Sequence, residues 1–423
     1  MGAGAAGLEA ARELEERGRS VLVLEARDRP GGRILTHHDP RIPLPIELGA
    51  EFIHGSAPVT EELLRRAGLS AMDVPAEHVS AHRGTLRRTD YWSAIDRVLK
   101  HIDTKGADES VASFLARRPG GRTLARERGL ARRFVEGFHA ADVRRISAQS
   151  IAPDPGETTS GETSRVGRVT QGYGALVAWL AHDLESSIRL SCEVKSITWR
   201  AGRATVVGRA PSGRFMRCTA RAVIVTVPVG VLAAPEGTPG TIAIDPEPPR
   251  LRKALDAFDM GCVVRVVVWF RDFPWQGAAR RFNFVHLPEG PFQVLWTANP
   301  LRWPLAVLWC GGPTGGALSR APRVVMSQAI LAQLAVGFGI RPRRVKAAIH
   351  RVWWHDWDHD PYARGAYTYH RVGHAEAHRE LARPVQQTLF FAGEATEEAG
   401  GTVEAALASG RRAARQVLRA LSR

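Results

Sequence analysis

The chain opens on a glycine fingerprint that constrains its fold more than any other feature. Gly2, Gly4 and Gly7 follow Met1 with the spacing Gly-x-Gly-x-x-Gly, which in βαβ units marks the turn from a first strand into a dinucleotide-binding helix. The first glycine permits the tight turn, the second lets the backbone approach a pyrophosphate, and the third lets helix and strand pack closely. An α/β domain with phosphates at a helix N-terminus is therefore expected here.

The residues after the fingerprint continue this unit. Apolar positions at helical spacing predict a helix over residues 8–17 that ends at Gly18. The apolar run 21–24 is typical of a buried parallel strand. Glu25 follows 18 residues after Gly7, near the spacing at which an acidic residue binds an adenosine ribose. Helix, strand and acid together predict dinucleotide binding.

Only Met1 precedes the fingerprint, where a dinucleotide-binding fold needs an entire β-strand. That strand would be the central one of the parallel sheet, so its loss would remove two ladders of hydrogen bonds and a buried apolar run. The simplest hypothesis is that the true start lies upstream, where about four to six aliphatic or β-branched residues would be encoded in frame. The alternative is a chain that folds poorly.

Blocks spread over nearly the whole chain resemble the flavin-dependent amine oxidase family. After Glu25 the chain continues ARDRPGGR, and IELGAEFIHG follows at 46–55. Further similar blocks come in family order at 220–232 (ARAVIVTVPVGVL), 357–369 (WDHDPYARGAYTY) and 389–414 (LFFAGEAT, then GGTVEAALASGRRAA). The family includes monoamine, polyamine and spermine oxidases, some L-amino-acid oxidases and flavin-type lysine-specific histone demethylases. The resemblance narrows the expected dinucleotide to FAD.

The resemblance also implies the domain organisation. An FAD-binding Rossmann-like domain of α/β class, without its N-terminal strand, would interleave with an α+β substrate-binding domain. The FAD-binding domain would comprise residues 1–56, 168–258 and 360–423, and the substrate-binding domain residues 57–167 and 259–359. Apolar periodicity predicts a helical first substrate segment that ends in a polar loop, and a second segment of strands and one helix.

The same resemblance implies which residues contact FAD. Arg33 would help neutralise the pyrophosphate, with a surface salt bridge as the alternative. Glu394 would lie near the ribityl and phosphate region, and the backbone of Val194 would contact adenine. Residues 401–403 would form a helix N-terminus that stabilises negative charge at flavin N1 and O2. The full expected set is Gly2, Gly4, Ala6, Gly7, Glu25, Ala26, Arg27, Gly32, Arg33, Gly49, Ala50, Glu51, Val194, Gly393, Glu394, Gly401, Thr402 and Val403.

Four further residues match substrate-side positions of the family. Trp357 and Tyr367 match the flavin-stacking tryptophan and one wall of an aromatic cage, which suits an amine through cation–π contact and desolvation. The other wall, a tyrosine in monoamine oxidases, is Thr402 here, as in polyamine oxidases and demethylases. His54 matches a histidine beside the amine channel of animal polyamine and spermine oxidases. The alternative for each aromatic or histidine is a packed core residue.

Two positions depart from the family pattern. The cysteine that links FAD covalently in monoamine oxidases is Ala366 here, so the flavin is expected to be noncovalent. The lysine that holds a water against flavin N5 is Arg265, judged by the register of MGCVVRVVVWF. Because arginine stays protonated and carries a bulkier planar fork, it cannot simply replace an ammonium group. This puts the water, and with it oxygen reactivity or imine hydrolysis, in doubt.

Composition argues against several other function classes. The net charge is +15, but basic residues are scattered singly or in pairs without interleaved aromatics, so no nucleic-acid partner is expected. No run of about 18 apolar residues predicts a membrane span. A loose group of histidines fits no metal-ligand set, and four separated cysteines are typical of a reduced, cytoplasmic protein. These residues are His355, His359, His370, His374 and His378, and Cys192, Cys218, Cys262 and Cys310.

The leading hypothesis is an FAD-dependent amine oxidase acting on a small-molecule amine. An unprotonated amine would give a hydride from its α-carbon to flavin N5, water would hydrolyse the imine, and oxygen would reoxidise the flavin to give hydrogen peroxide. One alternative is an amino-acid oxidase or another flavin dehydrogenase of the same fold, for which an arginine that pairs with a substrate carboxylate would be diagnostic. Another is an inactive or truncated flavin-fold protein. The sequence leaves the amine and the oligomeric state open.

Overall fold

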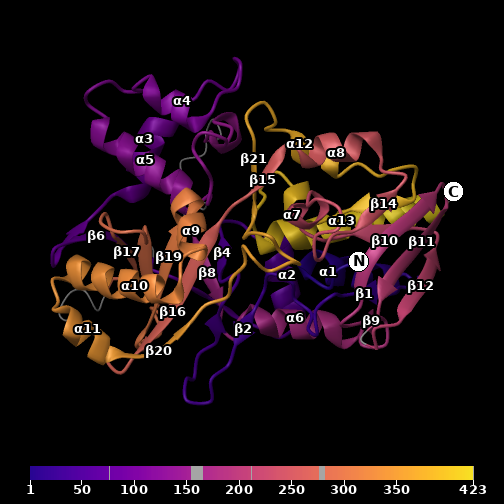
Figure 1. Cartoon of the computed structure of the whole chain (residues 1–423), viewed down its shortest axis with the longest axis horizontal. Helices are drawn as coiled ribbons and strands as arrows, with labels where there is room; N and C mark the ends of the chain where they lie inside the picture. Colours follow the sequence, from indigo (N-terminus) through magenta and orange to yellow (C-terminus); the bar gives the residue numbers. More distant parts are fainter. Residues whose placement is uncertain (76, 154–164, 211, 276–281, 423) are drawn as a thin grey trace.

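The chain alternates helices and strands in a mixed α/β architecture (Figure 1). The structure is a computed structural model that describes residues 1–75, 77–153, 165–210, 212–275 and 282–422. Both ends of the chain lie in the half of the molecule that contains α1 (Ala5–Glu15) and α13 (Val403–Leu421). No single helix among the described residues is long and apolar enough to cross a membrane; one pair, 323–338 with 342–348, passes by length and composition but is bent by 115°.

The fingerprint forms the turn into α1 as predicted, although the helix begins at Ala5 because Gly4 already serves as its N-cap. Parallel strands lie in two pairs on either side of Met1 and Gly2. The Gly2 amide donates to the Leu24 carbonyl over 2.8 Å, and the Met1 carbonyl accepts from the Thr226 amide over 3.0 Å. Met1 and Gly2 thus bridge the two pairs where the central strand was expected. The pairs are β1 (Val23–Leu24) with β9 (Ile188–Arg189), and β13 (Val223–Val225) with β22 (Leu389–Phe391).

Three helices enclose the core beside this sheet. α13 packs along α1, and α6 (Tyr173–His182) packs on its other side. Leu8, Leu176 and Leu407 are buried between them, and each such side chain contributes about 1.5–3 kcal/mol of hydrophobic stabilisation. This packing holds the fingerprint in place.

A four-stranded sheet lies at the outer side of this half of the molecule (Figure 1). Its order is β12 (Phe215–Ala220), β11 (Arg203–Arg209), β10 (Glu193–Arg200) and β14 (Ala243–Asp245), the first three strands antiparallel. Three short helices lie in segments that connect strands of this half: α7 (Val229–Leu232), α8 (Pro249–Leu255) and α12 (Ala377–Leu381).

A seven-stranded sheet forms the opposite half of the molecule. Its order is β20 (Ile349–Trp353), β16 (Val263–Phe270), β19 (Leu305–Gly311), β18 (Val294–Thr297), β17 (Phe284–His286), β6 (His78–His82) and β7 (Thr85–Arg88). Helices α9 (Gly312–Ser319), α10 (Arg323–Phe338) and α11 (Pro342–Ala348) accompany it. Above it in Figure 1 lies a helical cluster of α3 (Tyr91–Leu99), α4 (Val111–Ala116) and α5 (Ala125–Gly137).

The predicted helical segment 57–167 is wrong in part. It supplies the hairpin β6–β7 to the seven-stranded sheet, and β5 (Ala71–Asp73) to a small sheet with β4 (Phe52–His54) and β8 (Val166–Val169). Its first helix, α2 (Pro58–Arg66), packs against α13, where the Glu404 carboxylate accepts the Thr60 amide over 2.8 Å. The polar loop predicted for 154–167 lies largely outside the described residues. Other short strands are β2 (Thr36–His37), β3 (Ile46–Glu47), β15 (Phe258–Met260) and β21 (Thr368–His370).

Candidate active site

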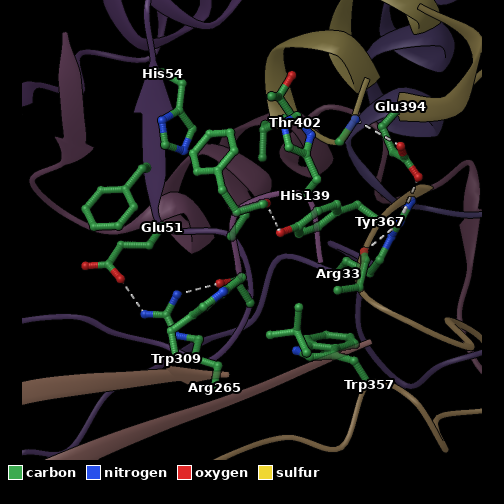
Figure 2. A pocket seen from close by; sticks show the side chains of 18 of the residues that line it. Arg33, Glu51, His54, His139, Arg265, Trp309, Trp357, Tyr367, Glu394 and Thr402 are labelled. Atoms are coloured by element: carbon green, nitrogen blue, oxygen red, sulfur yellow. Dashed lines mark hydrogen bonds and ion pairs between the residues drawn. The ribbon is translucent and has the colours of Figure 1, made fainter. Parts of the chain in front are cut away.

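A cavity of about 500 Å³ runs from the glycine fingerprint to aromatic side chains of the seven-stranded sheet and the helical cluster. Gly4, Glu25 and Arg33 line one end, and Phe138 and Trp309 line the other. Figure 2 shows the Arg33–Glu394 pair on one side of this space and the Arg265–Glu51 pair on the other. Segments far apart in the chain therefore contribute to one continuous space.

The N-terminus of α1 opens into the cavity. Its N-cap Gly4 provides no side-chain acceptor, and Gly4, Ala5 and Ala6 line the cavity, so free amides are available for an anion. A Cβ at Gly4 would come no nearer than 4.0 Å to any other residue. A Cβ at Gly7 would instead lie 1.9 Å from the Gly2 carbonyl oxygen. Gly4 thus keeps ligand space open, whereas Gly7, which does not line the cavity, permits packing.

Glu25 lies at the same end of the cavity, immediately after β1. Its carboxylate accepts the Ala3 amide over 2.7 Å and the Arg27 amide over 2.9 Å, so its orientation is fixed while other lone pairs stay available. Arg27 also lines the cavity and forms an ion pair with Asp360 at 2.7 Å. These contacts fit a ribose-binding acid held rigidly beside the phosphate loop.

Two expected contacts lie away from the cavity lining. Ala26 follows Glu25 but is absent from the lining residues. The Val194 side chain is buried in the core beside β10, with Ile197 and Trp199. Its segment still reaches the end of β1, because the Cys192 amide donates to the Glu25 carbonyl over 2.8 Å. Val194 therefore packs into the core two residues along the chain from this contact with Glu25.

Arg33 contacts the C-terminal motif that contains Glu394. Its guanidinium donates to the Glu394 carboxylate over 3.0 Å and to the Ala366 carbonyl over 2.8 Å. Glu394 also accepts the Gly401 amide over 3.0 Å. Arg33 thus lines the cavity while it is paired with the buried Glu394. Gly32, Gly49, Ala50 and Gly393 also line the cavity.

The N-terminus of α13 lies where the two ends of the cavity meet, a place called the junction below. Gly401, Thr402 and Val403 line it, and the Thr402 hydroxyl caps the helix by accepting the Ala405 amide over 3.0 Å. The positive end of a 19-residue helix therefore faces the cavity. Together with the free amides of α1, Arg33 and Glu25, it makes the residues present a good fit for a flavin dinucleotide.

Trp357 and Tyr367 stand at this junction. The Trp357 indole is buried and donates to the Leu48 carbonyl over 2.9 Å, while the Tyr367 hydroxyl donates to the Phe138 carbonyl over 2.6 Å. The Tyr367 ring lies against Gly401, where an added Cβ would be 3.4 Å from Cδ2. Both rings are oriented by hydrogen bonds and line the cavity. Together with Phe138 and Trp309 they wall the aromatic end of the cavity, called the chamber below.

The chamber is also lined by neutral histidines. Burial lowers the pKa of His54 to about 4, against an opposing effect of Glu51, and burial alone lowers the pKa of His139 to about 4. The His54 ring borders the cavity and meets Phe138 edge-on at 5.6 Å. Near neutral pH these imidazoles therefore place no positive charge beside a bound amine.

Arg265 is buried on β16 and paired with Glu51. Its guanidinium donates to the Glu51 carboxylate over 2.5 Å and to the Gly49 carbonyl over 2.8 Å. Glu51 also accepts from Arg168 over 2.6 Å and from the Trp296 indole over 2.9 Å. Burial alone would raise the pKa of Glu51, but the two arginines lower it below its ordinary value. Glu51, expected to contact the cofactor, thus lines the cavity and is the shared counter-ion of Arg168 and Arg265.

Several cavity residues were absent from the sequence prediction. They come from separate strands and helices, and no motif connects them. Only weak signals in the sequence pointed to them, such as the pair Phe138–His139 that follows α5. These residues are His78, Tyr91, Trp92, Arg133, Phe138, His139, Phe284, His286, Trp296 and Trp309. Among the described residues, no group of three or more histidine, cysteine or acidic side chains is placed to hold a metal ion.

Comparison with known proteins matches the chain to one family. The family model described as flavin containing amine oxidoreductase matches residues 5–418. The chain is 27% identical to probable polyamine oxidase 4 of Arabidopsis thaliana, over 97% of this chain and 84% of that protein. It is 26% identical to lysine-specific histone demethylase 1B of Mus musculus, over 94% and 49%.

Solved structures show the same fold. Wild-type putrescine oxidase bound to putrescine superposes with a TM-score of 0.81 at 21% identity, over 99% of this chain and 98% of that one. The fold likeness, the family match over nearly the whole chain and the flavin-sized cavity agree with one another. The chain belongs to the flavin containing amine oxidoreductase family.

Proposed function

We propose that this FAD-dependent amine oxidase binds a small unprotonated amine beside Trp357 and Tyr367 and releases an imine that water hydrolyses. The observation that carries the proposal is the continuity of one cavity from the N-terminus of α1, past the N-terminus of α13, into the aromatic chamber. A dinucleotide at one end and an amine at the other would therefore meet at the junction.

The residues at the first end would hold FAD. The amides of α1 and Arg33 suit the pyrophosphate, Glu25 the ribose, and the N-terminus of α13 the negative charge of a reduced flavin ring. When bound, FAD accepts a hydride from the amine α-carbon and passes the electrons to oxygen to give hydrogen peroxide. Ala366 lines the cavity without a thiol, and we infer noncovalent binding.

The chamber favours the reactive form of the amine. An ammonium loses its hydration on entering a space walled by Trp309, Tyr367 and Phe138, so desolvation favours the neutral amine that can release hydride. Neutral His54 and His139 add polar atoms without a charge. Aligning the α-carbon and excluding water are then the main contributions of the protein.

Substrate class, electron acceptor and cell compartment belong to the same proposal. Relatives described as polyamine oxidases and a putrescine oxidase support an amine as substrate. Oxygen is the acceptor we infer. The four cysteines are free and separate, which supports a reducing, cytoplasmic compartment.

The test is amine-dependent flavin reduction. Purified protein loaded with FAD is mixed anaerobically with a panel of monoamines, diamines, polyamines and amino acids, and then with oxygen. We expect loss of the visible flavin absorbance followed by its recovery with one equivalent of peroxide. A Tyr367→Phe variant, which keeps the ring, should react similarly, whereas Tyr367→Ala should react about 10- to 100-fold more slowly because alignment is lost. Bound flavin that no compound bleaches would refute the proposal.

A further inference from the structure

The end of the cavity farthest from the fingerprint carries a group of hydrogen-bond donors, here called the distal corner. It consists of His78 on β6, Tyr91 and Trp92 at the start of α3, Arg133 on α5 and His286 on β17, all of which line the cavity. In Figure 1 these elements lie on the opposite side of the molecule from α1 and the four-stranded sheet. The corner would therefore contact the part of a substrate remote from the reacting nitrogen.

Hydrogen bonds fix the tautomers of the two histidines. The Trp92 indole can only donate, and it donates to His78 Nε2 over 3.2 Å. A neutral His78 must then carry its proton on Nδ1, which lies 2.9 Å from His286 Nε2 and donates to it. His286 in turn carries its proton on Nδ1. Burial lowers the pKa of His78 to about 4 and lowers that of His286 well below its ordinary value, which keeps both rings neutral.

The last donor of this hydrogen-bonded series is the Nδ1–H of His286. Among the described residues no acceptor contacts His286 Nδ1, and its ring stacks on Tyr91 at a centroid distance of 3.9 Å. Burial raises the pKa of Tyr91, so its phenol keeps an O–H. The corner thus offers an imidazole N–H and a phenol O–H from adjacent rings.

Arg133 adds a positive charge to the distal corner. Its guanidinium donates to the Leu287 carbonyl over 2.6 Å and the Pro288 carbonyl over 3.3 Å. Within the described ranges no carboxylate lies in ion-pair distance of it. Glu136, one turn along α5, is near enough to favour its charged form but pairs with Arg132 at 3.4 Å. Arginine remains protonated even when half-buried, and the remaining N–H groups of Arg133 are free for an anion.

The acidic groups of the cavity cannot bind a second ammonium. Three carboxylates line it, at Glu25, Glu51 and Glu394. Glu25 accepts two backbone amides, Glu51 is shared by two arginines, and Glu394 is paired with Arg33. The space between the junction and the distal corner is bounded mostly by aromatic carbon, including Phe138, Phe284 and Trp296.

We propose that the distal corner binds a carboxylate, so that the preferred substrate is an amine with an apolar middle and a carboxylate at the end opposite its nitrogen. The planar fork of Arg133 matches the two oxygens of a carboxylate, and His286 and Tyr91 supply further donors. A diamine or polyamine would place its second ammonium against Arg133 without a carboxylate to receive it. This inference rests on the proposed function and departs from the substrate that the names of the relatives suggest.

The test compares three substrates of equal length: an ω-amino acid, the corresponding n-alkylamine and the corresponding α,ω-diamine, each over a series of chain lengths. In the unmodified enzyme we expect kcat/KM to be highest for an ω-amino acid and lowest for the diamine. In Arg133→Gln, the KM for the ω-amino acid should rise about 10- to 100-fold, as for loss of a charged hydrogen bond. The kcat of this variant for the ω-amino acid and its kinetics with the alkylamine should change little. Its kcat/KM for the diamine should rise.

Further variants separate binding from folding. Arg133→Lys keeps the charge and should restore part of the KM, and His286→Phe keeps the ring but loses the donor, which should raise the KM for the ω-amino acid about fivefold. Arg122→Gln removes an exposed arginine outside the cavity and should leave all three substrates unchanged. Preference of the unmodified enzyme for the diamine would overturn the inference, as would equal effects of Arg133→Gln on all three substrates.

A binding measurement keeps this inference separate from the proposed function. Hexanoate has no amine to oxidise, and titration calorimetry of the FAD-loaded protein measures its binding directly. Binding that Arg133→Gln weakens at least about tenfold supports the corner even if no amine reduces the flavin. No difference between hexanoate and n-hexanol as ligands would contradict it.

Discussion

The guanidinium of Arg265 is held by the carboxylate of Glu51 at 2.5 Å, deep between β16 and the loop before β4. Arg265 occupies a position where most of the family has a lysine. This difference put the reaction of the reduced flavin with oxygen in doubt. The structure gives the arginine a buried counter-ion and a second acceptor, the Gly49 carbonyl. Arg265 is therefore fixed in place by the protein through both terminal nitrogens of its guanidinium.

Replacement of Arg265 by lysine should increase the reactivity of the reduced enzyme with oxygen. A lysine ammonium can still pair with Glu51, but it is smaller, and it leaves room for a water that the planar guanidinium excludes. We expect reoxidation about tenfold faster, equivalent to about 1.4 kcal/mol of barrier. Stopped-flow mixing of the reduced protein with oxygenated buffer measures this rate, and an unchanged or slower rate would count against this account of the position.

Glu51→Gln should destabilise the fold. It would leave the Arg168 and Arg265 guanidinium groups close together without their shared carboxylate, and uncompensated buried charge typically costs about 3–5 kcal/mol. Urea unfolding of the FAD-free protein measures the change in the free energy of unfolding. The exposed pair Arg379–Glu376, at 2.6 Å, is the control, because breaking it by Glu376→Gln should change stability by less than about 1 kcal/mol. Similar effects of the two substitutions would show that Glu51 is not an essential counter-ion.

Gly4 and Gly7 should separate cofactor binding from folding. Gly4→Val places methyl groups in the open cavity, so the FAD-free protein should unfold at nearly the same temperature but bind little FAD. Gly7→Ala places Cβ 1.9 Å from the Gly2 oxygen, and should cost about 3 kcal/mol or more by overpacking. Thermal unfolding and the flavin-to-protein absorbance ratio distinguish the two. Loss of stability in Gly4→Val with FAD binding retained would contradict the assigned roles.

These glycines also mark how far sequence reasoning reaches. The roles of Gly4, Gly7 and Glu25 follow from local spacing, because a strand, a turn and a helix lie together in about 25 residues. The chamber could not be predicted in the same way. His78, Arg133 and His286 come from two strands and a helix that are distant in sequence, and only the long-range pairing of β6 with β17 brings the two histidines together.

The β6–β7 hairpin was missed for a physical reason. Its second strand, TLRR, is an exposed edge strand with charged side chains, so it lacks the alternating apolar pattern that predicts a half-buried strand. The Arg265–Glu51 pair was missed in part, because the sequence identified both residues but gave no reason to pair them. Long-range contacts between single polar residues have no periodic signature.

Stability should fall between neutral pH and pH 5, in part because of His139. Its folded-state pKa is about 4 through burial, whereas an unfolded histidine titrates near 6.5. In this window the unfolded chain binds more protons than the folded one, so the free energy of unfolding falls as the pH is lowered. His139 would contribute up to about 2 kcal/mol of that loss by pH 5.

The variant His139→Phe isolates this contribution. It replaces the imidazole by a ring that can keep the contacts with Phe134 and Phe138 and cannot be protonated. We expect the difference in unfolding free energy between pH 7.5 and pH 5 to be smaller in the variant than in the unmodified protein. Urea titrations at both pH values provide the comparison, and identical differences would mean that His139 is protonated in the folded state.

The central claim is that an amine bound beside Trp357 and Tyr367 loses hydride from its α-carbon. The most direct measurement is single-turnover flavin reduction under anaerobic, saturating conditions, with the best substrate and the same compound carrying deuterium at the α-carbon. The account predicts complete reduction in both cases and a slower rate with the deuterated amine. Flavin that stays oxidised, or reduction at the same rate with both compounds, would contradict it.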